Sequence, residues 1–164
     1  ADLAADRVRA MNEVATLEHR EATLHELARR CVAEIARPPR LAVPDPMALG
    51  PVPQDAEDVA SFLHRLTNVV RAMDVVEHAY GRPLAERDEL TGMLGGYATM
   101  ARRRAVAAVP AVASAAAAAL AAVRAVPCDV DLARERVATY QRLVRDTPPP
   151  ASAPPPAAQP GATS

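Results

Sequence analysis

The feature that most constrains this chain is an apolar stripe that runs from Val59 to Tyr80 and is followed by the tripeptide Gly81-Arg82-Pro83, which is typical of a turn. Apolar residues recur along it in steps of three and four, which is the spacing of one face of an α-helix. Gly81 comes next, and glycine readily adopts the left-handed conformation that ends many helices. Pro83 suits the first turn of a following helix, where its missing N–H costs nothing. The pattern therefore predicts an antiparallel helical hairpin over residues 61–104, with its turn at the glycine and the proline.

Three glycines interrupt the second predicted helix of this hairpin. Gly92, Gly95 and Gly96 each cost roughly 1 kcal/mol relative to alanine inside a helix. The interpretation that we favour is a kink, or close packing against the preceding helix of the same fold. The alternative hypothesis is an interaction face at Gly92 and Gly96, which lie four residues apart and would let another backbone approach closely.

The N-terminal segment, residues 1–37, has the pattern of one long amphipathic helix. Its apolar residues repeat every seven positions, at Leu3, Ala10, Leu17, Leu24 and Cys31. This repeat is typical of a coiled coil or of a long helix in a bundle. We therefore predict a docking seam at Leu17 and Leu24. A homodimer through this seam is the less favoured alternative, because Arg7 and Glu21 interrupt the seam.

The rest of the chain divides by composition. Residues 38–54 are rich in proline and predict a semi-rigid extended linker. Residues 55–146 predict a small bundle of three to four helices that contains the hairpin and ends in an amphipathic helix capped by Asp129 and Asp131. Residues 147–164 are almost entirely Pro, Ala, Ser and Thr, and predict a disordered tail. The predicted fold class is all-α.

The alanine-rich stretch at residues 105–123 carries no charge, so a membrane-spanning segment has to be considered. Alanine is nearly neutral for membrane insertion, and Pro110 interrupts the stretch. We expect instead an alanine-rich helix that packs closely on the hairpin, and a protein that does not span a membrane.

Composition and spacing argue against several chemistries. The net charge is −1 and aromatic residues make up 2% of the chain, so we expect no general affinity for nucleic acid. None of the four histidines belongs to a Glu-x-x-His or HExxH motif. Cys31 and Cys128 lack CxxC spacing and predict small reduced core residues of a cytoplasmic protein. We expect no catalytic residue, metal or cofactor, and no enzymatic activity.

Arg102, Arg103 and Arg104 form a basic cluster at the end of the predicted hairpin. Arginines near a helix C-terminus interact favourably with the helix dipole while they remain solvated, and this is the interpretation that we favour. The alternative is contact with phosphate, RNA or lipid headgroups, which would make the protein a regulator associated with nucleic acid or membrane.

Two stretches resemble a known kind of sequence: PLAERDELTGMLGGYATMA from Pro83 and PCDVDLARERVATYQRLV from Pro127. They are similar to a poorly characterised helical region of high-GC bacterial proteins that is sometimes associated with Ser/Thr kinase and phosphatase signalling genes. The resemblance covers about a quarter of the chain. It implies a small helical accessory module, and it assigns no functional residue. The alanine-rich segment between the two stretches departs from that pattern.

These observations favour a non-enzymatic protein–protein interaction or scaffold module of a bacterial signalling or assembly complex. It would act by helix-in-groove or coiled-coil docking with a protein partner whose identity the sequence does not specify. The predicted docking surfaces are the seam at Leu17 and Leu24 and the face at Gly92 and Gly96.

Overall fold

The computed structural model of this protein describes residues 2–151 and residue 161. In chain order its elements are α1 (Leu3–Glu34), the short 3-10 helix η1 (Pro46–Leu49), α2 (Ala56–Arg103), α3 (Pro110–Arg124) and α4 (Val130–Asp146). The described part of the chain contains four α-helices and no strand, so the predicted all-α fold class is confirmed. Most of the predicted disordered tail, residues 147–164, lies outside the described residues.

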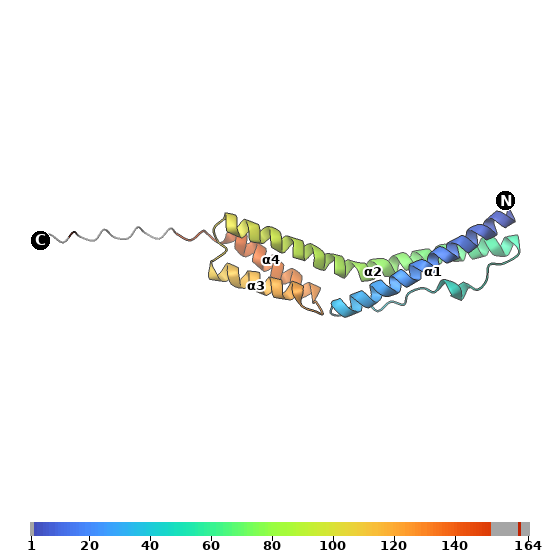
Figure 1. The fold of residues 1–164 in the computed structure, drawn as a ribbon, viewed down its shortest axis with the longest axis horizontal. Coiled ribbons are helices and arrows are strands. Elements are labelled where there is room, and N and C mark those ends of the chain that lie inside the picture. The colour runs from blue at the N-terminus through green and yellow to red at the C-terminus, as the bar shows by residue number, and fades with distance from the viewer. Residues whose placement is uncertain (1, 152–160, 162–164) are drawn as a thin grey trace.

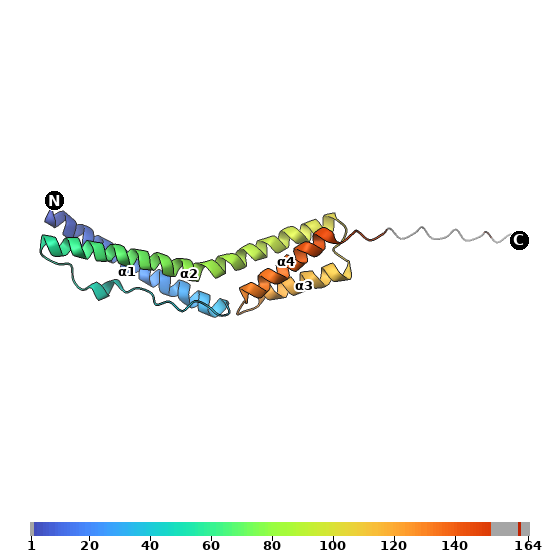
Figure 2. The ribbon, with the colours of Figure 1, turned by 180° about the vertical axis from the view of Figure 1, so that it is seen from behind.

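The predicted hairpin is wrong, because α2 continues through Gly81 and Pro83 as a single helix of 48 residues. Tyr80 and Leu84, on either side of the tripeptide, are both buried in the same core. Most helical stability in proteins comes from tertiary packing, and here this burial outweighs the local stop signal. Pro83 removes one backbone hydrogen bond and crowds the preceding turn, and α2 bends near its middle (Figures 1 and 2).

The predicted long N-terminal helix is confirmed by α1, which runs parallel to the N-terminal half of α2 (Figure 1). The seven-residue repeat of α1 is buried from Ala10 to Cys31. Its first three buried residues lie in one core cluster with Phe62, Leu66 and Met73 of α2. The apolar seam of α1 is therefore satisfied by another helix of the same chain.

The proline-rich linker lies against this helix pair. The Tyr80 hydroxyl donates a hydrogen bond to the carbonyl of Leu41 at 2.7 Å and accepts one from the Leu41 N–H at 3.0 Å. Near the other end of the linker, Arg7 Nε donates to the Pro53 carbonyl at 3.0 Å. Pro46, at the start of η1, is buried. The linker is thus packed along the helices over much of its length.

The C-terminal half of α2 packs with α3 and α4 (Figure 2). Asp129 caps α4 by accepting a hydrogen bond from the Leu132 N–H at 3.1 Å, as its position before an amphipathic segment predicts. Tyr97 of α2 and Tyr140 of α4 meet edge to face, with 6.3 Å between ring centroids. The predicted alanine-rich helix is present as α3, but it begins only at Pro110, which occupies its first turn.

Candidate functional site

The structure places the predicted seam of α1 inside the fold. Leu17 and Leu24 are 3% and 2% exposed and lie in the cluster with Phe62, Leu66 and Met73. The prediction that these two leucines form a docking surface is therefore corrected, because α2 already covers them. Sequence periodicity indicated that a seam exists without indicating which helix would cover it.

The glycine face of α2 lies on the surface. Gly92, Gly95 and Gly96 are exposed, and a Cβ built on any of them would meet no atom within 4 Å. Of the two explanations in the favoured interpretation, a kink or close packing within the fold, the close packing is therefore wrong. Two large apolar side chains flank the glycines, with Met93 at 41% and Met100 at 44% exposed. The result is a flat helix surface with apolar side chains beside it, and no element of the described chain covers it.

The three arginines of the basic cluster have different environments. Arg104 is partly buried and donates a hydrogen bond to the carbonyl of Val144 near the end of α4. Arg102 is exposed and donates to the Thr99 hydroxyl at 3.2 Å, while Arg103 is exposed in the last turn of α2. One guanidinium therefore supports the contact between α2 and α4, and the other two face solvent at the end of the glycine face.

A hollow of about 820 Å³ lies beside the bend of α2. One of its lining residues, Leu27, belongs to α1, and all the others belong to α2: Asp74, Glu77, His78, Gly81, Arg82, Ala85, Glu86 and Glu89. A straight helix presents a convex surface, so a hollow lined almost wholly by one helix requires that helix to bend. We call this hollow the elbow groove.

Carboxylates dominate the walls of the elbow groove. At one end Arg20 of α1 bridges Asp74 and Glu77, with N–O distances of 2.6 Å and 2.8 Å. The hydrogen bonds to Glu77 and then to Asp74 raise the pKa of Arg20. At the other end Glu86 is held by Arg134 of α4, whose pKa is raised chiefly by that hydrogen bond.

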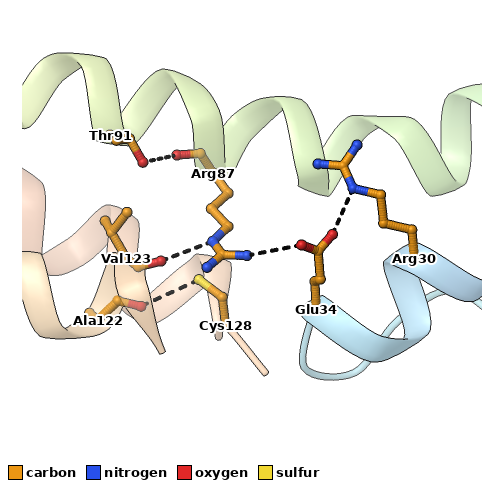
Figure 3. Close-up of polar contacts among 7 residues, drawn as sticks. All are labelled: Arg30, Glu34, Arg87, Thr91, Ala122, Val123 and Cys128. Carbon is orange, nitrogen blue, oxygen red and sulfur yellow. Dashed lines mark hydrogen bonds and ion pairs between the residues drawn. The ribbon is translucent and has the colours of Figure 1, made fainter. Parts of the chain in front are cut away.

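A polar junction connects the two halves of the molecule behind the bend (Figure 3). Arg87 of α2 donates to the carbonyl of Val123 in α3 at 2.9 Å, and its guanidinium lies 3.9 Å from the carboxylate of Glu34 in α1. Glu34 also accepts a hydrogen bond from Arg30 at 2.7 Å. These contacts join the end of α1, the middle of α2 and the end of α3.

Backbone pairing reinforces this junction. The Cys128 N–H donates to the Glu34 carbonyl at 2.7 Å, and the Ala36 N–H donates to the Cys128 carbonyl at 2.8 Å. Alongside, Arg37 forms an ion pair with Asp129 at 3.0 Å. The pKa of Asp129 is lowered, first by the backbone N–H that it caps and then by Arg37. The junction fixes the α3–α4 turn against the end of α1.

The two cysteines at the junction are buried. Cys31 and Cys128 are free thiols with no exposed surface, and burial is the main cause that raises the pKa of each. A raised pKa keeps a thiol protonated and unreactive at neutral pH.

Within residues 2–151, no group of three or more His, Cys, Asp or Glu side chains is arranged to hold a metal ion. Nor is any helix of that part both long and apolar enough to cross a bilayer.

Comparisons with protein-family models, with curated proteins and with solved structures found no match for this chain. The resemblance to a helical signalling-associated region stays a prediction. Function therefore has to be inferred from the surfaces of the chain itself.

Sequence reasoning placed part of the site and missed the rest. It identified Gly92 and Gly96, which the structure leaves open on α2, and it did not identify the elbow groove. Asp74, Gly81 and Ala85 share a helical face with the glycines only if the helix is continuous. The predicted turn at Gly81 concealed that relation.

Proposed function

We propose that this protein is a non-enzymatic interaction or scaffold module of a bacterial signalling or assembly complex, and that it docks a helix of a protein partner on the outer face of α2. The observation that supports this proposal most directly is the open glycine face. Three glycines on one exposed stretch of helix cost roughly 2–3 kcal/mol relative to alanine. No contact within the described chain offsets that cost, whereas a docked helix would benefit from the close backbone approach that glycine allows.

The residues around the glycines suit the same role. Met93 and Met100 are flexible and polarisable, and such side chains adapt to the irregular surface of a partner. The interaxial distance of packed helices depends on the side chains between them, so a glycine floor permits the shortest approach. The mechanism is helix docking on a rigid helical surface.

Two pairs of substitutions test the proposal with a matched control. Gly92→Leu with Gly96→Leu fills the open face, whereas Gly92→Ala with Gly96→Ala keeps it nearly flat; both pairs raise helix propensity. Each tagged variant is used to capture partners from a nuclease-treated lysate of the source organism, and the bound proteins are quantified. We expect a stoichiometric partner to be retained by the alanine pair and lost from the leucine pair. A partner that binds both equally well would contradict docking on this face.

A further inference from the structure

The two halves of the molecule share little besides α2. In the described part of the chain, no Cα atom of α1 lies within 8 Å of one in α3 or α4. One core cluster lies wholly in the N-terminal half, and the other fills the C-terminal half and reaches the end of α1. The second connection is the junction, where the end of α1 meets the turn between α3 and α4 (Figures 1 and 2). The angle between the halves therefore depends on α2 and on the junction together.

Four polar contacts of the junction cross from one half to the other. Two are the backbone hydrogen bonds that the N–H and the carbonyl of Cys128 make with the chain at the end of α1. The other two are ion pairs. Glu34 lies 3.9 Å from Arg87, beyond the bend of α2, and Arg37 lies 3.0 Å from Asp129, at the start of α4 (Figure 3 shows the first pair).

The bend of α2 has the composition of a hinge. Pro83 has no N–H, so the carbonyl four residues before it loses its helical partner. Gly81 lies two residues earlier, and glycine has the greatest backbone freedom. Hinges in proteins are a few residues that absorb the change in φ and ψ. The proline explains why α2 bends at this point, whereas the nearby glycine allows the angle to vary.

The ion pairs of the junction are open to solvent. The side chain of Arg37 is 70% exposed. A hollow of about 210 Å³ beside it is lined by Pro83 and Asp129 among others, so water and small ions reach the pair. Exposed ion pairs contribute little stability each, and dissolved salt screens them. The contacts that fix the angle are therefore the ones most sensitive to ionic strength.

We propose that the junction is a salt-sensitive latch that holds α2 at its observed angle, with Gly81 and Pro83 as the hinge. With the ion pairs intact, the C-terminal half is held against the end of α1. When they are screened or removed, the two halves change angle about the hinge while each keeps its own core. The elbow groove changes shape with that angle, because it lies beside the bend. This inference does not depend on the proposed function.

The test measures the distance between the halves with two spin labels and pulsed electron paramagnetic resonance. The labels are attached to Ala15→Cys in α1 and Gln141→Cys in α4, both at exposed positions. At 1.5 Å per residue, the two positions lie about 30 Å and about 18 Å along their helices from the junction, so a change of angle moves them appreciably. Cys31 and Cys128 have no exposed surface, so two labels per chain are expected.

One pair of substitutions opens the latch, and a second pair is the matched control. Glu34→Gln with Arg37→Gln removes both ion pairs that cross the junction. Glu26→Gln with Arg29→Gln removes an ion pair of 3.8 Å within α1 and makes the same change in composition and charge. The junction pair should broaden the distance distribution at least about twofold, as should sodium chloride raised from about 50 mM to about 1 M with the native sequence at the junction. The control pair should match the unsubstituted junction.

Two results would overturn the inference. One is a distance distribution that neither the junction pair nor salt changes, and the other is equal broadening by the control pair. Pro83→Ala separates the latch from the proline: the mean distance should stay within about 3 Å, since the junction still holds the halves. A shift caused by Pro83→Ala alone would show that the proline sets the angle. Circular dichroism at 222 nm should show the same helix content throughout, and the salt series needs no change at the junction.

Discussion

Replacing the exposed glycines of α2 by alanine should stabilise the protein. Gly92, Gly95 and Gly96 lie within a continuous helix, and a Cβ at each position meets no atom within 4 Å. The substitutions therefore create no clash and no strain, and they remove the conformational entropy that glycine loses in a helix. At roughly 0.8–1.0 kcal/mol per site, the triple alanine variant should gain about 2–3 kcal/mol in the free energy of unfolding.

The measurement is urea denaturation followed by circular dichroism at 222 nm, together with a thermal melt. For a chain of this size the gain corresponds to a rise in Tm of about 5–10 °C. Gly50 provides the control, because it also has open space around a built Cβ but has φ +77°. In that conformation a side chain is strained, so Gly50→Ala should lower the free energy of unfolding by about 1–3 kcal/mol.

The triple alanine variant should raise the free energy of unfolding and Gly50→Ala should lower it, although neither new side chain meets a neighbouring atom. The difference therefore reports backbone conformation and not packing. If the triple variant gains nothing, or loses stability, while Gly50→Ala behaves as expected, then the three glycines are not in an open helix. Either α2 is interrupted there or another element covers the face. The claim that the glycine face is exposed would then be refuted, and the proposed docking surface with it.

Three further predictions concern the core and the junction. Leu24→Ala should lower the free energy of unfolding by about 2–5 kcal/mol, measured by urea denaturation, because the side chain is buried against α2; a cost below about 1 kcal/mol would show that α1 does not pack there. Asp129 has a lowered pKa in the folded state, so the stability that its carboxylate provides is present above its unfolded pKa and is lost as the pH falls through the folded value. Asp129→Asn should therefore reduce the loss of stability between about pH 5 and pH 2, and an unchanged acid profile would contradict the contacts of the Asp129 carboxylate with the Leu132 N–H and with Arg37. Cys31 and Cys128 should not react with a thiol reagent such as dithionitrobenzoate until the protein is unfolded, and rapid labelling of the native protein would refute their burial.

The elements that sequence predicted well are those with strong periodicity. The seven-residue repeat of α1 and the amphipathic pattern of α4 identified both helices, and the Asp129 cap marked the start of α4. Such signals are local, because they depend on which residues share one helical face. The tripeptide at Gly81 failed as a predictor because tertiary packing, and not the local sequence, decides whether the helix ends there. Burial of Tyr80 and Leu84 on either side keeps the helix continuous, and nothing in the local sequence reports that burial.

The two predicted docking surfaces also show that a sequence pattern does not report tertiary burial. Both the seam of α1 and the glycine face of α2 have patterns that suit a second helix, and the sequence gives no means of telling which will be covered within the chain. Only the fold distinguishes them, because it buries Leu24 and leaves Gly96 open. The elbow groove needs a further condition, since its concave shape requires the bend of α2 as well as the face on which its residues lie.

The extended architecture explains why α2 holds both candidate surfaces. Each half of the molecule has only a thin layer of helices, α1 with the linker in one half and α3 with α4 in the other, and α2 belongs to both (Figure 1). One side of α2 therefore lies outside both cores along its length. A solvated helix side is ordinarily built from residues of high helix propensity. On α2 that side instead carries glycines in its C-terminal half and a carboxylate-lined hollow at its centre. Since the exposed glycines do not stabilise the chain by themselves, their placement on that side is the strongest structural reason to propose a recognition role for α2.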